Sequence, residues 1–271
     1  MPELPEVETT RRGIVPLVEG RTVAAVTVRE SRLRQPVPEN LAALLCGEEL
    51  LAVGRRAKYL LFRFARGTLI VHLGMSGSLR VVPPATPFKK HDHIEITFAG
   101  ERRLRFHDPR RFGLMIWSAD PVEQHPLIAH LGPEPWDEAF DAAYLHASGS
   151  NRRAAVKNLI MDGHVVVGVG NIYASEALYR ARVHPRRAAG RVSLARYARI
   201  VVAIREVLAE AIEVGGTTLR DFVKSDGEPG YFRLQLNVYG RTGEPCPGCH
   251  RPIRQAVIGQ RSSFYCPACQ R

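Results

Sequence analysis

The sequence predicts an α+β fold in which an N-terminal β-sandwich follows a leading helix and a C-terminal helical domain ends in a β-hairpin. Three observations carry this prediction. Residues 22–118 consist mostly of short apolar or alternating runs separated by glycine and proline. Apolar residues recur at helical spacing over 197–211. Four of the five cysteines lie within the last 26 residues, around two short alternating runs.

The leading helix is predicted from the first residues of the chain, MPELPEVETT. Pro5 suits the first helical position, because proline has no N–H to leave unpaired there. Glu3, Glu6 and Glu8 complement the positive end of a helix dipole. The segment therefore has an adequate structural interpretation as a helix start.

The same segment also admits a chemical interpretation. Once Met1 has been removed, Pro2 carries a secondary amine at the chain end. An α-amine titrates at about 7.7–8.0, so part of it is neutral and nucleophilic near pH 7. Glu3 lies beside it as a candidate general acid. From the residues of this segment alone, both interpretations stay open.

The strands predicted for the first half of the chain lie between Thr22 and Ser118, and their spacing is typical of a β-sandwich or barrel. Residues 121–147 are rich in proline, aspartate and glutamate and show little periodicity. We therefore predict a β domain over 2–133, a linker over 134–153, a helical domain over 154–236 and a terminal module over 237–271. The predicted strands are Val23–Val28, Leu50–Val53, Tyr59–Phe64, Leu69–Leu73, Ile94–Phe98, Leu104–Phe106 and Leu114–Trp117.

Three helices are predicted in the second half. A short helix covers Ala154–Met161, and another covers Ile172–Tyr179 with Asn171 as its N-cap. Two helices joined by a glycine-rich turn resemble a helix-turn-helix variant. The third and longest helix begins behind a Ser193 cap, and Gly215-Gly216 is expected to end it.

The clustered cysteines have the spacing C-x2-C-x16-C-x2-C, formed by Cys246, Cys249, Cys266 and Cys269. Each C-x2-C pair can turn two thiolates toward one ion, and four thiolates complete the tetrahedral shell of structural zinc. A closed four-cysteine shell leaves no position open for a substrate. We therefore predict one Zn²⁺ that supports structure and takes no part in chemistry.

Two strands are predicted between the cysteine pairs, over Ile253–Ile258 and Ser262–Tyr265, with a turn near Gly259. This hairpin would display Arg261 at its tip. From the local sequence alone, Arg261 is equally well interpreted as a solvated turn residue.

The charge of the chain points to a polyanionic partner. Lysine and arginine number 38 against 27 acidic residues, which gives a formal net charge of +11. The chain begins without a targeting pattern, and no stretch reaches the length of a membrane span. The clustered cysteines are unlike a secreted disulfide framework. We therefore expect a cytoplasmic protein with no membrane partner.

Seven motifs in a fixed order give the chain a resemblance to bacterial formamidopyrimidine-DNA glycosylases, from Pro2 to Arg271. A single one of these motifs would be weak support, but their order and the placement of one at the extreme N-terminus make coincidence a poor explanation. The motifs are MPELPEVETTRRG, Arg56-Ala57-Lys58-Tyr59, His72-Leu73-Gly74-Met75-Ser76-Gly77, Lys90-His91-Asp92-His93, Asp108-Pro109-Arg110-Arg111-Phe112-Gly113, Gly168-Val169-Gly170-Asn171-Ile172-Tyr173 and the four-cysteine tail.

The resemblance implies a bifunctional DNA glycosylase and AP lyase of base excision repair. Such an enzyme removes 8-oxoguanine and formamidopyrimidines from duplex DNA through a Schiff base and then cleaves the strand by β,δ-elimination. Pro2 is the implied nucleophile, and Glu3 the implied acid for base departure. Lys58 is the implied proton donor for β-elimination, and Arg261 the corresponding group for δ-elimination. The implied fold includes a helix-two-turn-helix and a zinc finger.

The resemblance also implies how the chain holds DNA. Met75, Arg110 and Phe112 match the residues that fill the gap left by an extruded nucleotide. His91, Arg110, Arg152 and Asn171 fall where the family contacts DNA, mostly at phosphates. Arg152 stands where the family pattern has a lysine, which keeps the charge but changes the donor geometry. The glycine-containing segment over 215–232 is similar to the family's loop over the everted base.

Several alternatives remain at this point. An endonuclease VIII-type glycosylase for oxidised pyrimidines shares the fold, the proline and often the zinc. A non-catalytic zinc-finger DNA-binding protein would explain the charge and the cysteines, but not three carboxylates at the start of the chain. His91 and His93 could suggest a second metal site, but no third ligand is evident. We expect a monomer associated with the nucleoid.

Overall fold

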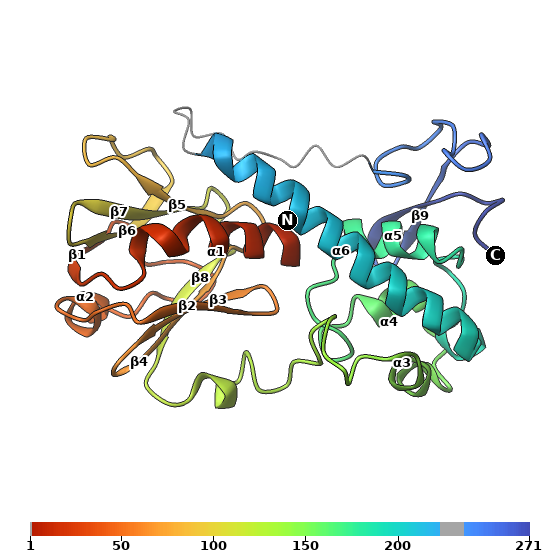
Figure 1. The fold of residues 1–271 in the computed structure, drawn as a ribbon, viewed down its shortest axis with the longest axis horizontal. Coiled ribbons are helices and arrows are strands. Elements are labelled where there is room, and N and C mark those ends of the chain that lie inside the picture. The colour runs from red at the N-terminus through yellow and green to blue at the C-terminus, as the bar shows by residue number, and fades with distance from the viewer. Residues whose placement is uncertain (1, 223–235) are drawn as a thin grey trace. The chain divides into compact units, whose positions relative to one another are not determined.

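The computed structural model describes residues 2–222 and 236–271, with side chains described for all of these except 216–222. The chain forms two compact units (Figure 1). Residues 2–130 belong to the first unit, and residues 131–214 and 236–271 belong to the second. Residues 223–235 lie outside the described residues, and they include residues 223–232 of the segment 215–232 that was predicted as a loop over an everted base.

Two four-stranded antiparallel sheets form most of the first unit, which confirms the β-sandwich. One sheet has the strand order β1-β6-β7-β5, and the other has the order β2-β3-β4-β8. Alternate residues of β3, Leu60, Phe62 and Phe64, enter a core shared with Ile94 and Ile96 of β6. The strands are β1 Val23–Val28, β2 Ala52–Arg56, β3 Tyr59–Phe64, β4 Gly67–His72, β5 Ser78–Val82, β6 Asp92–Phe98, β7 Arg102–His107 and β8 Leu114–Ser118.

Helix α1, Leu4–Val18, packs along the edge strands of both sheets and contacts β2 of one and β5 of the other. Its apolar stripe, which includes Val7 and Ile14, is buried in the sandwich core. Pro5 takes the second helical position and not the expected first, because Glu3 is the N-cap. Both positions lie in the first turn, where a missing N–H costs no intrahelical bond. Two short helices, α2 Leu41–Leu45 and η1 Val122–Gln124, complete the unit.

The sequence patterns missed β5 and misplaced β2. In β5 only Leu79 is fully buried, so the strand has too little alternation to stand out. The strand predicted over Leu50–Val53 lies instead over Ala52–Arg56. It extends beyond the apolar run because the polar residues Arg55 and Arg56 continue its pairing with β3. Edge strands of this kind carry a weak apolar signal because only one face is buried.

Four α-helices form the second unit's core, and α6 contributes to it with its residues up to Val214. The helices are α3 Ala142–Gly149, α4 Val156–Ile160, α5 Asn171–Arg180 and α6 Leu194–Phe222. A short η2 helix, Ala189–Arg191, precedes α6. The apolar stripe of α6, which includes Tyr197, Ile204 and Leu208, packs against α5 residues such as Ala174 and Leu178. The second unit also contains a hairpin of two antiparallel strands, β9 Arg254–Ile258 and β10 Arg261–Tyr265. Strand β10 contacts α5.

The helix boundaries correct three expectations. Gly170 is the N-cap of α5, and Asn171 is its first residue. Helix α6 continues through Gly215-Gly216 to Phe222, since two helical glycines cost only about 1 kcal/mol each. The segment 134–153, expected as a linker, contains α3 and places Phe140 and Leu145 in the second core. It is therefore part of the second unit. Among the described residues, no helix is long and apolar enough to cross a membrane.

Candidate active site

The start of α1 holds Glu3 in a buried capping position directly after Pro2. Glu3 is the N-cap of the helix, and only 2% of its surface is exposed. Its carboxylate accepts a hydrogen bond from the backbone N–H of Glu6, and the Glu6 carboxylate accepts one from the Glu3 N–H at 2.8 Å. The structural and the chemical interpretation of Glu3 are therefore compatible. The cap fixes a carboxyl group one residue from the candidate nucleophile.

Lys58 lies in a two-residue turn between β2 and β3. Arg56 pairs with Tyr59 across this hairpin, and Ala57 adopts a left-handed conformation with φ 54°. A left-handed alanine costs about 1–2 kcal/mol. Arg55 stabilises the turn by donating from Nη1 to the Ala57 carbonyl oxygen at 2.8 Å. The strained turn thus presents Lys58 on a rigid hairpin.

Glu8 connects α1 to that hairpin, a role that the sequence did not reveal. The carboxylate accepts hydrogen bonds from Arg11, Arg12 and Arg55 at 2.8–3.2 Å. Burial alone would raise the pKa of Glu8, but these guanidinium groups outweigh it and lower that pKa to about 2. Since Arg55 also holds the turn of Lys58, one buried carboxylate joins the helix that begins at Glu3 to the β2–β3 hairpin.

Two adjoining loops present the side chains expected to enter a duplex. Met75 is 38% exposed and Phe112 is 45% exposed, although both are large and apolar. The Arg110 guanidinium lies over the Phe112 ring at 4.7 Å. A Cβ at Gly74, whose φ is +66°, would lie 2.4 Å from the backbone of Phe112 and of Gly113. The two loops therefore touch backbone to backbone, and only glycine permits this approach.

Asp108 holds both loops with a single buried carboxylate and was also missed from the sequence. It is fully buried and accepts hydrogen bonds from Ser76 Oγ and the Gly113 N–H, each at 2.8 Å. The Arg110 N–H is 3.3 Å from the same carboxylate. His93 Nε2 lies 2.7 Å from the Asp108 carbonyl oxygen, which anchors the loop to β6. The Asp108-Pro109 dipeptide is a turn signal that could have suggested this role.

The His72 side chain is hydrogen-bonded to the backbone of the Met75 loop. Its Nδ1 accepts a hydrogen bond from the Gly74 N–H at 2.9 Å, so the imidazole is unprotonated at that atom. Burial lowers the pKa of His72 to about 4, and the nearby charges of Arg34 and Lys58 add to this effect. The imidazole is therefore neutral at pH 7.

His91, a candidate DNA contact, lies half-buried at the start of β6. Its ring is 6.2 Å from that of His93 and 6.0 Å from that of His107. Burial and the neighbouring charges, Lys90 first among them, lower the pKa of His91. His107 Nδ1 is bound to an Asp92 oxygen at 2.8 Å. Within 2–222 and 236–271, the four cysteines are the only group of side chains that meets the geometry of a metal site, so the histidines form none.

In the second unit, Asn171 is fastened to the hairpin by a buried lysine. Lys157 is fully buried, and its Nζ donates to Asn171 Oδ1 and to Ser263 Oγ, both at 2.5 Å. Asn171 Nδ2 donates to the Ser262 carbonyl oxygen at 2.9 Å. Sequence reasoning did not single out Lys157, because a lysine within an apolar helical stretch carries no sign of its burial. The Asn171 side chain is thus used to join α5 to β10.

Arg152 and Arg261 are both exposed. Arg152 precedes α4 and lies 3.8 Å from Asp162, a weak surface pair. Arg261 begins β10 and pairs with Ile258 across the two-residue turn Gly259-Gln260, where both residues have positive φ. This is the turn type that suits a tight hairpin. The expectation that Arg261 lies at the hairpin tip is confirmed.

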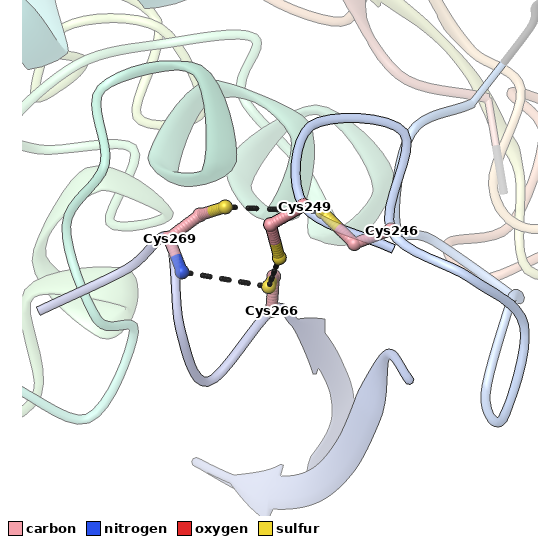
Figure 2. Close-up of side chains that lie close together, drawn as sticks. All are labelled: Cys246, Cys249, Cys266 and Cys269. Carbon is pink, nitrogen blue, oxygen red and sulfur yellow. Dashed lines mark hydrogen bonds between the residues drawn. The ribbon is translucent and has the colours of Figure 1, made fainter. Parts of the chain in front are cut away.

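The four cysteine sulfurs converge on one point (Figure 2), and all lie within 4.8 Å of one another. Cys246 and Cys269 are 3.9 Å apart at their sulfurs, and Cys249 and Cys266 are 3.4 Å apart. Tetrahedral Zn²⁺ with Zn–S bonds of about 2.3 Å requires sulfurs about 3.8 Å apart. The donor set and its geometry fit one structural zinc ion.

The surroundings of the cysteines prepare them to bind a cation. Burial raises the pKa of Cys246, but the Tyr179 hydroxyl and the N–H groups of Gly248 and Cys249 outweigh it and lower that pKa to about 6. Burial raises the pKa of Cys269 to about 12, and the neighbouring sulfurs add to this effect. A metal ion offsets this repulsion among the thiolates.

Glu176 of α5 fastens the segment that leads into the cysteine module. Its buried carboxylate accepts hydrogen bonds from the backbone N–H groups of Asn237, Val238 and Tyr239, each at 2.9 Å. Three amide donors on one carboxylate form a strong, charge-assisted anchor. The module is therefore attached to α5 at this segment as well as at β10.

Comparison with family models gives consecutive matches over most of the chain. Residues 1–115 match the formamidopyrimidine-DNA glycosylase N-terminal domain, and residues 131–223 match the formamidopyrimidine-DNA glycosylase H2TH domain. Residues 243–271 match the zinc finger found in FPG and IleRS. The four-cysteine cluster is therefore the zinc site of this module.

Curated relatives match over the full length. The chain is 59% identical to the formamidopyrimidine-DNA glycosylase of Methylococcus capsulatus, over 100% of both chains. It is 60% identical to that of Alkalilimnicola ehrlichii, again over 100% of both. The agreement includes both ends of the chain, where the candidate nucleophile and the zinc ligands lie.

Solved structures share the fold. The MutM (FPG) protein of Thermus thermophilus matches with a TM-score of 0.85 and 42% identity, over 99% of this chain and 98% of that one. A Lactococcus lactis FPG variant in complex with a Fapy-dG containing DNA matches with a TM-score of 0.90 and 32% identity, over 99% of each chain. A MutM in complex with carbocyclic 8-oxo-G containing DNA matches with a TM-score of 0.89 and 32% identity, over 100% of each chain.

Proposed function

This chain belongs to the formamidopyrimidine-DNA glycosylase family, and from that premise we propose that Pro2 attacks damaged nucleotides in duplex DNA. The protein is a base excision repair glycosylase that removes oxidised purines, 8-oxoguanine and formamidopyrimidines, and then cleaves the strand as an AP lyase. One observation carries the proposal: Pro2 directly precedes a buried carboxyl group, Glu3, that a helix start holds in place. A helix cap alone requires no glutamate, since serine, threonine and aspartate are better caps.

The chemistry follows from the secondary amine. With Met1 removed, the Pro2 nitrogen attacks C1′ of the damaged nucleotide, the glycosidic bond breaks, and Glu3 supplies the proton that assists base departure and sugar opening. The product is an iminium ion, which has no N–H to lose and therefore stays cationic. This cation accepts the electron pair released when a proton leaves C2′, and the 3′ phosphate departs by β-elimination. A second elimination releases the 5′ phosphate.

Proton transfers in the two eliminations are assigned to Lys58 and Arg261. Lys58 lies on the β2–β3 hairpin, which Arg55 and Glu8 connect to the helix that starts after Pro2. Its positive charge favours the neutral, nucleophilic form of a nearby amine. Arg261 begins β10 at the tip of the zinc-supported hairpin and is exposed. Lys58 serves β-elimination in this assignment, and Arg261 serves δ-elimination.

The exposed loops complete the proposal for DNA. Met75, Arg110 and Phe112 fill the gap left when the damaged nucleotide leaves the stack, and their exposure and mutual support by Asp108 fit that role. His91, Arg152 and Asn171 contact the DNA backbone. For Asn171, whose side chain is used internally, the donors are backbone N–H groups at the start of α5.

We propose a catalytic β domain that begins at residue 2, a helical DNA-binding domain over 154–236 whose core also includes α3 from the segment 134–153, and a zinc finger over 237–271. The protein works as a monomer, in the cytoplasm on nucleoid DNA. The net charge of +11 supports binding to a polyanion of this kind.

Borohydride trapping tests the nucleophile, because borohydride reduces an iminium to a stable covalent link. We expect trapping on a duplex with 8-oxoguanine opposite cytosine and none on the undamaged duplex. A variant with an N-terminal extension before Pro2 should lose trapping and regain it when a protease removes the extension. Trapping that persists with the extension in place would exclude Pro2. Preferential trapping on an oxidised pyrimidine would instead assign the endonuclease VIII specificity.

A further inference from the structure

A cavity of about 650 Å³ in the second unit is lined by arginines and has no role in the proposed reaction. It is formed by the end of α5, the first turns of α6 and the cysteine module. Its lining also includes the small residues Gly248 and Ala268, the ring of Tyr179 and the zinc ligand Cys269. Its guanidinium groups belong to Arg180, Arg182, Arg196, Arg199 and Arg271.

Most of this charge has no acidic partner. Arg180 is paired with Glu210 at 2.6 Å and with Glu206 at 3.2 Å. In the described parts of the chain, no carboxylate of an acidic residue pairs with the other four arginines of the cavity. Arg196 donates to a main-chain oxygen of Arg271, the last residue, whose terminal group is a carboxylate, at 3.2 Å. The guanidinium groups of Arg182, Arg199 and Arg271 have no acidic partner among the described residues. The cavity therefore concentrates positive charge in a concave site, where the field is focused.

Arg182 carries its charge at a position where glycine would be less strained. It follows the end of α5 with φ 57°, and its N–H bonds to the Tyr179 carbonyl oxygen at 3.0 Å. The Val183 N–H bonds to the Leu178 carbonyl oxygen at 3.0 Å, which completes a Schellman motif. Glycine dominates the left-handed position of this motif, because other residues pay about 1–2 kcal/mol there. Arg182 therefore keeps a strained backbone conformation at a position that lines the cavity.

The cavity lies apart from the candidate DNA contacts of this unit. Asn171 begins α5 and Arg180 ends it, and nine residues of helix separate them by about 14 Å. The hydrogen bonds that join Asn171, Lys157 and Ser263 lie at the N-terminal end of α5, and the cavity lies at its C-terminal end. A ligand in the cavity therefore meets none of these three side chains.

The lining selects among anionic ligands. Arginine forks bind phosphate oxygens bidentately, and converging guanidinium groups favour a ligand with several charges close together. An acidic peptide would need apolar anchors, and the lining offers no large aliphatic side chain. A duplex presents its phosphates along a convex surface, whereas this site is concave. We propose that the cavity is a binding site for a compact oligophosphate, such as inorganic tripolyphosphate or the triphosphate group of a nucleotide.

Calorimetric titration of the zinc-loaded full chain with sodium tripolyphosphate tests the site. We expect one bound ion per chain, and at least a ten-fold higher Kd for the double variant Arg182→Gly, Arg199→Gln. The glycine relieves the left-handed position, so this variant keeps the fold and its thermal transition. Arg102→Gln, which removes an exposed arginine of the first unit, should bind as the wild type does. Zinc content measured after titration shows that the heat does not come from chelation.

The outcomes separate the sources of the phosphate. Binding of a nucleoside triphosphate with similar affinity assigns the site to phosphate groups, free or on a nucleotide. Equal affinity in the double variant and the wild type would overturn the proposal, as would the absence of binding. Displacement of tripolyphosphate by a short undamaged duplex would make the cavity part of the DNA surface, and tight binding of hexaglutamate would make it a peptide site. Either result contradicts an oligophosphate site.

Discussion

The two units hold their functional loops by different means. In the first, the loops of Met75 and Phe112 depend on one buried carboxylate, Asp108, and the Lys58 hairpin depends on another, Glu8. In the second, the hairpin of Arg261 lies between two pairs of thiolates that a metal ion joins. Hydrogen-bonded carboxylates need only a folded core around them. A four-thiolate cluster needs its ion, because its charges repel one another in the ion's absence.

The difference teaches where loop stability comes from in a chain of this size. The sandwich of the first unit has a core large enough to bury carboxylates with their partners. The cysteine module has a core of few residues, including Val238, Ile253 and Phe264, and gains its remaining stability from the metal. Loss of the metal ion or of one of its ligands should therefore destabilise the cysteine module, whereas protonation or substitution of a buried carboxylate should destabilise the loops of the first unit.

Loss of one thiolate should have the largest effect. Cys266→Ser removes a buried zinc ligand. In zinc-finger peptides, structural zinc binds with an apparent free energy of about 10–16 kcal/mol, which stabilises the folded module. We expect amides of residues 246–269 to lose protection from hydrogen exchange while the first unit keeps its unfolding transition. Cys46→Ser, at an exposed cysteine outside the cluster, is the matched control. Simultaneous unfolding of both units would show that their supports are not independent.

Removal of the candidate acid should affect chemistry and leave the scaffold in place. Glu3→Gln keeps an acceptor for the Glu6 N–H but cannot donate a proton as a carboxylic acid does. Base excision in single-turnover assays should fall by about 10²–10⁴-fold, the usual contribution of general acid catalysis. Glu6→Gln changes the same helix start and should cost less than ten-fold. A Glu3→Gln variant with wild-type excision would leave Glu3 only its capping role.

Asp108 tests the carboxylate support of the loops. Asp108→Asn turns one acceptor oxygen into a donor that faces the N–H of Gly113 or the hydroxyl of Ser76. Buried networks broken in this way typically lose about 2–4 kcal/mol. Urea unfolding should show that loss in the first unit, and Asp120→Asn, at an exposed acid of the same unit, should show none. Excision should fall further than stability explains, because Met75 and Phe112 lose their fixed positions.

Acid should weaken the Glu8 connection by a smaller amount. The pKa of Glu8 is lowered from 4.5 to about 2 in the folded chain, so its stabilisation is complete above pH 5 and is lost as pH falls toward 2. The shift corresponds to about 3 kcal/mol. Urea unfolding at pH 7, 4 and 2.5 should show a shallower acid loss for Glu8→Gln than for the wild type. Glu39→Gln, an exposed control, should follow the wild-type curve. Parallel curves for Glu8→Gln and wild type would contradict the assigned role.

Sequence reasoning found the features that are local in the chain. The zinc ligands, the hairpin turn at Gly259 and the strand Tyr59–Phe64 each have a signal within a few residues, and the structure places them as predicted. Spacing and alternation suffice because the physical requirement, two thiolates on one ion or one buried face, is itself local. The glycines at 215 and 216 mislead for the same reason. A local helix breaker is tolerated here because a long helix precedes it and each glycine costs only about 1 kcal/mol.

Features that depend on distant contacts were not found. Asp108 meets Ser76 across 32 positions, and Lys157 meets Ser263 across 106. One aspartate or lysine gives no sign that its partner lies so far along the chain, and burial of a charge opposes the usual expectation for its residue type. The supports of the site are therefore less visible in the sequence than the groups that they support.

Glu3 couples the reaction to the ordering of a helix end. Its carboxyl group accepts the bond from the Glu6 N–H, and an ionised carboxylate accepts more strongly than a neutral acid. Each proton that Glu3 gives up or regains therefore tightens or loosens the first turn of α1. The hydrogen-exchange rate of one backbone amide, that of Glu6, should therefore report the protonation state of the Glu3 carboxyl group in a protein that carries no added label.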